Sequence, residues 1–467
     1  MSNHTASAPQ GVGKSRSNTT HHVLIVGAGL CGALLATRLG QRGFRVDLYE
    51  RRADPRGQDT AAGRSINLAL SARGLWALER VGLKEAVLKH CIPMHGRMIH
   101  PLEGAPFLSP YSARPDDYIN SVSRSGLNDL LLDAADAHPN VTLHFEHKCV
   151  GVDLKNAAAT FERPDGTQHE RSGEILIGTD GAGSAVRRAM MGRTTELLFN
   201  YSQHFLRHGY KELTLHPAAD GGWQIEPNAL HIWPRDQFMM IALPNPDGSF
   251  TLTLFHPFDG EWGFDRLTDR ERVCAFFERF YPTLLPYLPH YLDEFFENPV
   301  GTLGTIKCSP WQAYGKTLIM GDAAHAIVPF YGQGMNASFE DVRVFDDLLD
   351  RDFPDWEACF EAYQELRIPN AAAIADLAID NFHEMQDKTN DAHFIQKRKL
   401  EMQLERDLPD YYSKYSLVTF RPELDYATAL KRGRAQDEFL LDLVERSEEP
   451  LSPQAVYERL RRAVPID

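Results

Sequence analysis

The sequence predicts an α/β protein with three parts: a Rossmann-type dinucleotide-binding domain, an inserted antiparallel β-sheet domain and a C-terminal helical region. Three observations carry this prediction. Residues 22–50 read as a strand, a glycine-rich turn, a helix and a second strand. Residues 231–255 read as two β-strands joined by an Asn-Pro-Asp-Gly turn. From Phe339 onward, helical periodicity dominates almost to the end of the chain.

The glycines of the first segment have the spacing of a dinucleotide fingerprint. Gly27 allows the tight turn, Gly29 lets backbone N–H groups approach a pyrophosphate, and Gly32 lets helix and strand pack closely. Glu50, at the end of the second strand, is placed to hydrogen-bond a ribose hydroxyl. The alternative is a glycine-rich turn of an ordinary doubly wound domain, but the complete strand, turn, helix and strand favour nucleotide binding.

Composition and charge disfavour several classes of protein. A length of 467 residues suggests two or three domains, and a net charge of −15 disfavours nucleic acid or an anionic membrane as the main partner. The six cysteines lack CxxC spacing, so neither a zinc site nor a disulfide framework is indicated. The polar residues 1–20 are expected to form a disordered tail, and no run reaches the roughly 18 apolar residues of a membrane span. We therefore expect a cytoplasmic protein without a metal site.

The remaining elements follow in order along the chain. Residues 63–70 are expected to be extended and to enter an amphipathic helix that ends near Leu88, and Arg97 begins another β-like stretch. A helix is expected over 127–138, strands over 141–152 and 159–163, and a strand with a glycine-rich turn over 174–188.

The second half is expected to complete two of the domains. The strands over 231–243 and 249–255 belong to the inserted sheet, and Thr268 with Glu271 reads as the capping box of a helix. Residues 317–320 return as a buried strand, and the later helices are expected to break near Pro354, Pro369, Pro409 and Pro422. The predicted boundaries are 1–20 for the tail, 21–200 with 301–365 for the nucleotide domain, 201–300 for the inserted sheet and 366–467 for the helical region.

Two further motifs are typical of a flavin site. Residues 317–325 lead a strand into a Gly-Asp turn, which places the Asp322 carboxylate beside a polyol hydroxyl. The glycines of residues 328–336 permit close approach to a flat ring, and a helix starting near Met335 directs its positive end at that ring. With GAGLCG at 27–32, GTDGAGSAVR at 178–187 and GDAAHAIVPFYGQGMN at 321–336, the chain resembles the FAD-dependent aromatic hydroxylases with a single Rossmann-type FAD domain.

The resemblance narrows to the kynurenine 3-monooxygenase family and covers the chain from His22 to about Phe420. It is carried by GRSINLAL at 63–70, GRMIH at 96–100, HGYKEL at 208–213, EPNALHIWPR at 226–235, MMIALPN at 239–245 and YSLVTF at 415–420. The resemblance implies a reaction in tryptophan degradation. NADPH is expected to reduce FAD, O₂ to add at flavin C4a, and the resulting hydroperoxide to convert L-kynurenine to 3-hydroxykynurenine. NADPH is expected to bind transiently, because the sequence has no second GxGxxG.

The resemblance also implies a set of cofactor contacts. Gly27, Gly29, Cys31 and Gly32 are expected at the pyrophosphate, Glu50 and Arg52 at the ribose, and Ala69 near the flavin. Arg124, Asp180, Asp322, Met335 and Asn336 complete the expected set, with Cys149 near the adenine end.

Substrate recognition is expected to hold an amino-acid carboxylate and an aniline ring. Arg97 is the expected carboxylate clamp, because a guanidinium binds a carboxylate through two hydrogen bonds. The resemblance adds Tyr111, Asn381 and Tyr415, with Phe250 and Phe330 beside the ring. Relatives carry Phe or His where this chain has Tyr331, which leaves the role of Tyr331 open. No catalytic acid or base is assigned, because the flavin carries the chemistry.

Several alternatives stay open at the level of sequence. Animal and fungal relatives end in a hydrophobic membrane anchor, whereas residues 451–463 here read as a polar helix, so no membrane anchor is expected in this chain. A related flavin hydroxylase for another aromatic amine or acid is the first alternative. A flavin reductase or dehydrogenase and a non-enzymatic flavin-binding module are the others.

Overall fold

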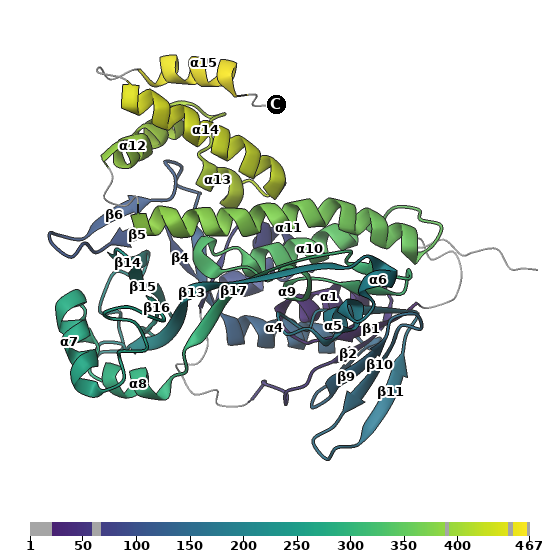
Figure 1. Ribbon diagram of the computed structural model, residues 1–467. Helices are drawn as coiled ribbons and strands as arrows, with labels where there is room; N and C mark the ends of the chain where they lie inside the picture. Colours follow the sequence, from purple (N-terminus) through teal and green to yellow (C-terminus); the bar gives the residue numbers. More distant parts are fainter. Residues whose placement is uncertain (1–20, 58–66, 388–391, 447–451, 465–467) are drawn as a thin grey trace, which may run out of the picture.

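A six-stranded, mostly parallel sheet forms the centre of the nucleotide domain (Figure 1). The computed structural model describes residues 21–57, 67–387, 392–446 and 452–464. The strand order is β18-β19-β12-β1-β2-β8, with β1 (His22–Val26), β2 (Arg45–Tyr49), β8 (Val141–His144), β12 (Ile175–Gly178), β18 (Gln312–Ala313) and β19 (Thr317–Ile319). The β1 residues Val23, Leu24 and Ile25 are fully buried, as expected for a parallel strand covered on both faces.

Helices and two small sheets surround this centre. Helix α1 (Leu30–Gln41) follows β1 and packs against α4 (Arg124–Asp136) and α10 (Gly334–Leu348). One small sheet contains β9 (Lys148–Asp153), β10 (Ala158–Glu162) and β11 (Gln168–Ser172), and the other contains β3 (Asn67–Leu70), β4 (Ile92–Met94) and β7 (Ile119–Ser123). The short helices of this part are α2 (Ala72–Arg80), α3 (Lys84–Leu88), α5 (Ala185–Met191), α6 (Thr194–Leu197), α9 (Asp322–His325) and the 3₁₀ turn η2 (Pro329–Tyr331).

A seven-stranded sheet forms the second layer, with the order β17-β13-β16-β15-β14-β5-β6. Its strands are β5 (Gly96–Ile99), β6 (Phe107–Pro110), β13 (Asn200–Leu215), β14 (Leu230–Arg235), β15 (Phe238–Pro244), β16 (Phe250–Pro257) and β17 (Gly301–Ser309). The expected single strand over 231–243 is wrong: β14 and β15 form a hairpin that turns at Asp236, whose φ is 52°. The expected turn at 245–248 is present, with the Gly248 N–H donating to the Asn245 carbonyl over 3.2 Å.

The two faces of this sheet pack against different partners. One face, with Trp233, Met240 and Leu252, packs on α7 (Arg270–Phe280), η1 (Leu285–Tyr287) and α8 (Tyr291–Glu297). The other face, with Ile232, Met239 and Phe255, packs on η2 and the C-terminal helices. Helix α7 is capped by Asp269, which accepts from the Arg272 N–H over 2.8 Å, so the cap lies one residue after the expected Thr268.

The predicted domain boundaries need correction at two places. Strands β5, β6 and β17 belong to the seven-stranded sheet, although they lie outside residues 201–300. Helix α11 (Trp356–Asp387) runs for 32 residues through Pro369 and through the boundary predicted at 365/366. Proline removes one helical hydrogen bond, but buried residues on both sides of it, from Phe360 to Ala378, hold the helix in place. The tail predicted over 1–20 lies outside the described residues.

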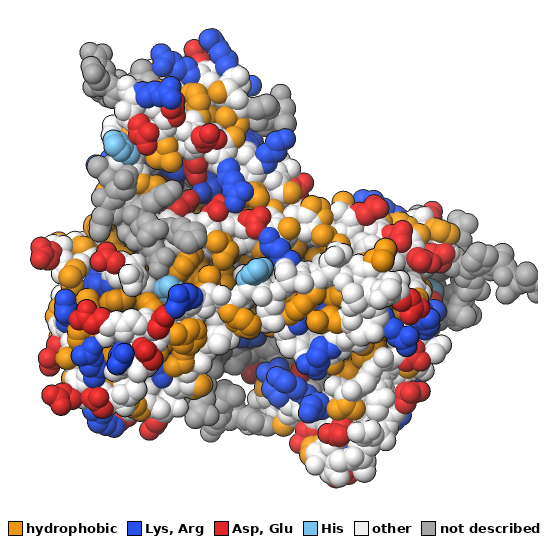
Figure 2. Space-filling model, viewed as in Figure 1, with side chains coloured by type: hydrophobic (Ala, Val, Ile, Leu, Met, Phe, Trp, Pro, Cys, Tyr) orange, Lys and Arg blue, Asp and Glu red, His pale blue; other side chains and the backbone are white. Residues whose placement is uncertain are grey.

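The C-terminal helices form a separate layer at the top of Figure 1. They are α12 (Ala392–Asp407), α13 (Lys414–Thr419), α14 (Tyr426–Arg446) and α15 (Pro453–Ala463). Figure 2 shows charged side chains interspersed with apolar ones over this layer. Within the described residues, every helix is too short or too polar to cross a membrane.

Candidate active site

The turn after β1 forms an open cradle at the N-terminus of α1. Gly27 has a φ of 105°, and a Cβ atom there would lie 2.6 Å from the Cα of Asp180. A Cβ at Gly32 would lie 2.0 Å from the Gly27 carbonyl oxygen, so both positions require glycine. A Cβ at Gly29 would meet nothing within 4 Å among the described residues. Gly29 therefore faces open space at a helix N-terminus, which fits the pyrophosphate of a dinucleotide.

Glu50 ties the end of β2 to this turn. Its carboxylate accepts from the Ala28 N–H over 3.1 Å and from Arg52 Nε over 2.7 Å. Burial raises the pKa of Glu50, but the Arg52 hydrogen bond and charge outweigh burial and hold the pKa below its ordinary value. The structure therefore places an ionised carboxylate and an exposed arginine side by side, next to the cradle.

Asp180 and Cys31 lie under the cradle, and both side chains have partners in the protein. The Asp180 carboxylate accepts from Ser184 Oγ over 2.5 Å and from the Ala185 N–H over 2.6 Å, so it caps α5. Burial raises the pKa of Asp180. Cys31 is buried, and its Sγ lies 3.7 Å from the Ser338 carbonyl oxygen.

Three of the other predicted cofactor residues lie around the nucleotide domain. Asp322 is exposed in the first turn of α9, Arg124 is exposed at the start of α4, and Cys149 is half-buried in β9. Burial raises the pKa of Cys149, and the charge of Asp180 raises it further.

Asn336 closes the loop that precedes α10. Its Nδ2 donates to the carbonyls of Ala69 over 2.8 Å and Gly332 over 2.9 Å, and its Oδ1 accepts from the Ser71 N–H over 2.9 Å. Asn336 is fully buried, and Met335 beside it is half-buried. The three bonds fix the end of β3, the glycine loop and the α10 N-terminus relative to one another. GRSINLAL belongs to this region only from Asn67 onward, because residues 63–66 lie outside the described part.

A tyrosine–arginine cluster lies between the large sheet and the C-terminal helices; it consists of Arg97, Tyr111, Tyr331 and Tyr415. The Tyr415 ring stacks on Tyr111 at a centroid distance of 5.1 Å and on Tyr331 at 5.5 Å. The Arg97 guanidinium lies 5.0 Å from the Tyr415 ring centre and 5.7 Å from that of Tyr111. The four side chains come from β5, the loop after β6, η2 and α13.

The cluster contains buried donors with no acceptor in the described protein: Arg97 Nε and the hydroxyls of Tyr111 and Tyr331. Burial raises the pKa values of Tyr111 and Tyr331 well above the ordinary value of 10.0, so both hydroxyls keep their protons. Burial lowers the pKa of Arg97, but the facing tyrosine hydroxyls and Glu384 raise it overall. A charged guanidinium beside two buried tyrosine hydroxyls is suited to bind a carboxylate.

The aromatic and amide residues predicted for the substrate differ in where they lie. Asn381 is buried in α11, and its Nδ2 donates to the Phe330 carbonyl over 2.6 Å, which holds η2 beside the cluster. Phe330 packs on Phe255 and Phe382, at centroid distances of 4.9 and 4.4 Å. Phe250 is not brought to the cluster: its buried side chain belongs to the opposite face of the sheet, with Leu252 and the α7 residues. The prediction that Phe250 neighbours the substrate ring is therefore wrong.

Tyr331 is the member of the cluster whose role the sequence left open. One indication in the sequence pointed to Tyr331 as a site residue: it lies one residue before Gly332, in the loop that joins two flavin motifs. Its unpaired hydroxyl could be found only in the structure. Lys414 was missed as well; it is buried next to Tyr415 and its Nζ pairs with Glu384 and with Asp437 over 2.6 Å.

Comparison with known proteins agrees with this architecture. A profile of the FAD binding domain family matches residues 20–200 and 294–376. Two solved structures share the fold. The structure of 2-methyl-3-hydroxypyridine-5-carboxylic acid oxygenase is 20% identical with a TM-score of 0.65, and the match covers 80% of this chain and 94% of that chain. A variant of Klebsiella pneumoniae HpxO, complexed with FAD, is 19% identical with a TM-score of 0.64, over 81% of this chain and 94% of its own.

Curated relatives are more similar in sequence. The kynurenine 3-monooxygenase of Myxococcus xanthus is 44% identical over 91% of this chain and 90% of its own. That of Dictyostelium discoideum is 44% identical over 90% of this chain and 93% of its own, and that of Xanthomonas campestris is 42% identical over 92% and 93%. With the FAD fold and the tyrosine–arginine cluster in place, these similarities show that the chain belongs to the kynurenine 3-monooxygenase family of FAD-dependent monooxygenases.

Proposed function

We propose that the protein hydroxylates L-kynurenine to 3-hydroxykynurenine, with one NADPH, one H⁺ and one O₂ consumed and NADP⁺ and water released. The observation that carries the proposal is the cluster of unpaired buried donors at Arg97, Tyr111 and Tyr331. A hydrogen-bond donor is costly to bury without an acceptor. The carboxylate of an amino-acid substrate would supply acceptors for these donors.

The protein groups have separable roles in this proposal. Gly27, Gly29 and Gly32 with Glu50 and Arg52 would hold the dinucleotide end of FAD, while Ala69 and the Asn336 loop would line its ring. Bound FAD supplies the redox chemistry, because it accepts hydride from NADPH and activates O₂ for insertion into the aromatic ring. Arg97, Tyr111 and Tyr331 would bind the substrate carboxylate, which fixes the position of the ring.

Water exclusion is the second contribution of this site. Tyr111, Phe330 and Tyr331 are buried, and Tyr415 is half-buried beside them. Asn381 of α11 holds η2 in place through its bond to the Phe330 carbonyl. An enclosed site protects reactive species from water and strengthens the hydrogen bonds of the carboxylate clamp.

Stopped-flow reduction of the bound FAD by NADPH, with and without L-kynurenine, tests the proposal. We expect kynurenine to accelerate reduction, and mass spectrometry to find 3-hydroxykynurenine after turnover in air. If kynurenine leaves the rate unchanged and no hydroxylated product forms, the proposed substrate is wrong.

Arg97→Ala separates substrate binding from flavin binding. We expect the KM for kynurenine to rise by about tenfold or more while the FAD content stays near that of the wild type, because in this proposal Arg97 contacts the substrate and not FAD. Arg52→Ala is the matched control, since the same change beside Glu50 should weaken FAD retention and leave the KM of the loaded enzyme nearly unchanged. Loss of FAD from the Arg97 variant would identify a flavin contact instead.

A further inference from the structure

Arg73 is a buried arginine that the proposed chemistry does not use. It lies in α2, four residues after Ala69, and is 1% exposed. Its Nε donates to the Val418 carbonyl over 2.7 Å, and its Nη2 donates to the Leu424 carbonyl over 2.6 Å and the Arg421 carbonyl over 3.3 Å. One guanidinium therefore holds three backbone carbonyls of a segment about 345 residues away in the sequence.

The segment that Arg73 binds is the end of α13 and the loop that leads into α14. The last carbonyls of a helix have no partner within the helix, and the helix dipole places negative charge there. Arg73 supplies both hydrogen bonds and positive charge at that point. Helix α13 is only six residues long, and it carries Tyr415 of the tyrosine–arginine cluster.

On its other side, Arg73 is anchored to α10 and to the loop before it, residues 328–336, which we call the flavin loop. Its Nη1 pairs with Glu340 of α10 over 2.8 Å, and its guanidinium lies 3.9 Å from the Tyr426 ring centre. Helix α10 begins at the loop in which Asn336 binds the Ala69 carbonyl. The Tyr426 hydroxyl in turn donates to Gln333 of the same loop over 3.0 Å.

We propose that Arg73 is a positioning residue, which sets the distance and angle between Tyr415 and the flavin loop by capping α13 from the FAD domain. The proposal rests on the proposed function, in which Tyr415 belongs to the substrate site. Arg73 touches neither the cluster nor the cradle, so it acts through α13 on one side and α10 on the other.

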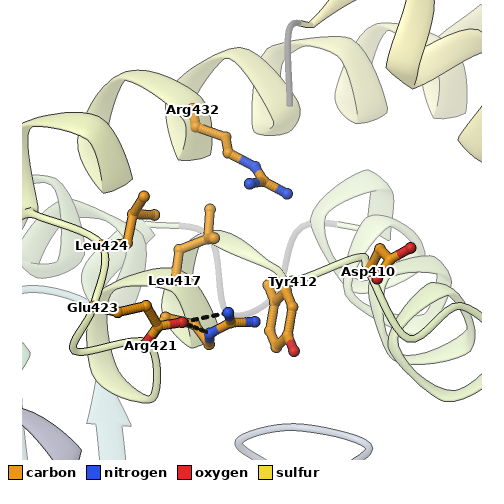
Figure 3. A pocket seen from close by; sticks show the side chains of 7 residues that line it. All are labelled: Asp410, Tyr412, Leu417, Arg421, Glu423, Leu424 and Arg432. Carbon is orange, nitrogen blue, oxygen red and sulfur yellow. Dashed lines mark hydrogen bonds and ion pairs between the residues drawn. The ribbon is translucent and has the colours of Figure 1, made fainter. Parts of the chain in front are cut away.

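The outer side of the same segment is only partly filled. A cavity of about 310 Å³ lies there, lined by Asp410, Tyr412, Leu417, Arg421, Glu423, Leu424 and Arg432. Figure 3 shows Leu417 and Leu424 beside this cavity, with Arg421 paired to Glu423 at its rim. The three Arg73 bonds therefore hold α13 together with other contacts: Glu405 accepts from the Ser413 N–H over 2.9 Å and from Ser416 Oγ over 2.5 Å, and Lys414 pairs with Asp437 over 2.6 Å.

Arg73→Lys is the test variant, because lysine keeps the cation beside Glu340 but cannot bind all three carbonyls at once. Arg42→Lys is the matched control. Arg42, in the turn after α1, pairs with Asp346 and donates to the Asp346 carbonyl at the end of α10 over 2.8 Å, so it also caps a helix. Its helix end lies away from the tyrosine–arginine cluster.

Two measurements report on the variants. Hydrogen exchange of peptides covering residues 413–424 reports how firmly α13 and the loop after it are held, whatever the substrate is. Steady-state kinetics of the FAD-loaded enzyme report the KM for kynurenine and the fraction of NADPH oxidation that yields H₂O₂ from O₂.

We expect Arg73→Lys to speed exchange in residues 413–424 and to raise the KM by about tenfold or more with FAD retained. Arg42→Lys should leave both within about twofold of the wild type. Unchanged exchange in a folded Arg73→Lys enzyme would overturn the proposal, as would faster exchange with an unchanged KM. If the wild type fails to turn over kynurenine, the proposed function falls and the exchange result alone decides the role of Arg73.

Should Arg73→Lys not fold, a second pair keeps the proposal testable. Tyr426→Leu removes the ring under the guanidinium, whereas Tyr426→Phe keeps the ring and removes only the bond to Gln333. Faster exchange and a raised KM in the leucine variant, and smaller changes in the phenylalanine variant, are expected. Equal behaviour of the two variants would contradict a role for the Arg73 geometry.

Discussion

Tyr331 and Tyr111 are alike in environment but come from different parts of the chain. Each has a buried hydroxyl without an acceptor in the described protein, and each lies within the tyrosine–arginine cluster. A phenylalanine at position 331 would keep the stack on Tyr415 and remove only the donor. In the proposed carboxylate clamp, the Tyr331 hydroxyl is therefore a donor that can be removed without loss of the ring.

Tyr331→Phe should raise the KM for kynurenine with little change in kcat. Loss of one hydrogen bond to a charged group costs about 1.5–3 kcal/mol, which corresponds to roughly 10- to 150-fold in kcat/KM. Steady-state kinetics on the FAD-loaded variant measure the effect. A KM within twofold of the wild type would show that the hydroxyl faces away from the substrate.

The pH dependence of substrate binding follows from the same tyrosines. Burial raises the pKa of Tyr415 as well as those of Tyr111 and Tyr331, so all three lose their protons only above pH 10.0. Because the neutral hydroxyl is the donor, the clamp is complete below that pH and is lost as pH rises through the raised pKa values. We expect the KM for kynurenine to show no tyrosine-dependent rise between pH 7 and about 9.5. A rise with a midpoint near pH 8–9 that disappears in Tyr331→Phe would contradict this assignment.

Among the elements, the loop before α10 shows how one side chain can hold three segments together. The Asn336 amide pairs with two carbonyls and one N–H from three neighbouring segments. The loop that would line the flavin ring is therefore shaped by Asn336 from beneath. The predicted contact of Asn336 with the cofactor stays a prediction, while its side-chain amide supports the loop.

Asn336→Ala should weaken the hold on FAD. Each buried polar group left unpaired costs about 1–3 kcal/mol, and the loss falls on the loop itself. Thermal release of flavin fluorescence should occur at a lower temperature than in the wild type. Asn140→Ala is the control, because Asn140 binds the carbonyls of Gly40 and Phe44 over 2.9 and 2.7 Å at the far end of α1. In Asn140→Ala, flavin release and unfolding should shift together to a lower temperature. In Asn336→Ala, flavin should be released before the protein unfolds. Identical temperature profiles for the two variants would contradict the prediction.

Local patterns allowed the βαβ unit to be predicted, because Gly27, Gly32 and Glu50 act within one short segment. The hairpin at Asp236 was missed because its φ of 52° has no strong signal in a Pro-Arg-Asp-Gln sequence. The face of Phe250 depends on register with β13 and β15, which no local pattern specifies. Pro369 suggested a helix end, but packing along α11 outweighed the lost hydrogen bond. The Arg97 site gathers four distant segments, so its members were predicted from the family resemblance rather than from spacing.

At the scale of the whole molecule, the C-terminal helices have a small core of their own. Leu404, Tyr411, Leu440, Val456, Tyr457, Leu460 and Val464 form it, and it is distinct from the core of the nucleotide domain. Four of these seven residues belong to α15 or directly follow it. The helix therefore stabilises α12 and α14 rather than the flavin cradle.

Removal of α15, by ending the chain after Arg446, should destabilise the C-terminal layer and spare FAD binding. Each buried apolar side chain that is lost costs about 1.5–3 kcal/mol, and all four lie in the small core. Limited proteolysis should cut first within residues 392–446, while the flavin absorbance per protein stays close to that of the full chain. Loss of flavin on truncation would show that the two cores are coupled.

The seven-stranded sheet combines strands that lie far apart in the sequence, and this affects how the protein folds on the ribosome. The pair of strands β5 and β6 ends at Pro110, but β14, which pairs with β5, ends at Arg235, about 125 residues later. At common rates of synthesis this interval lasts about 6–25 s. The parallel sheet is completed later still, because β19, which pairs with β12, ends only at Ile319. Strand edges that stay exposed during that wait favour aggregation, so we expect a supply of chaperones during translation to raise the yield of folded enzyme.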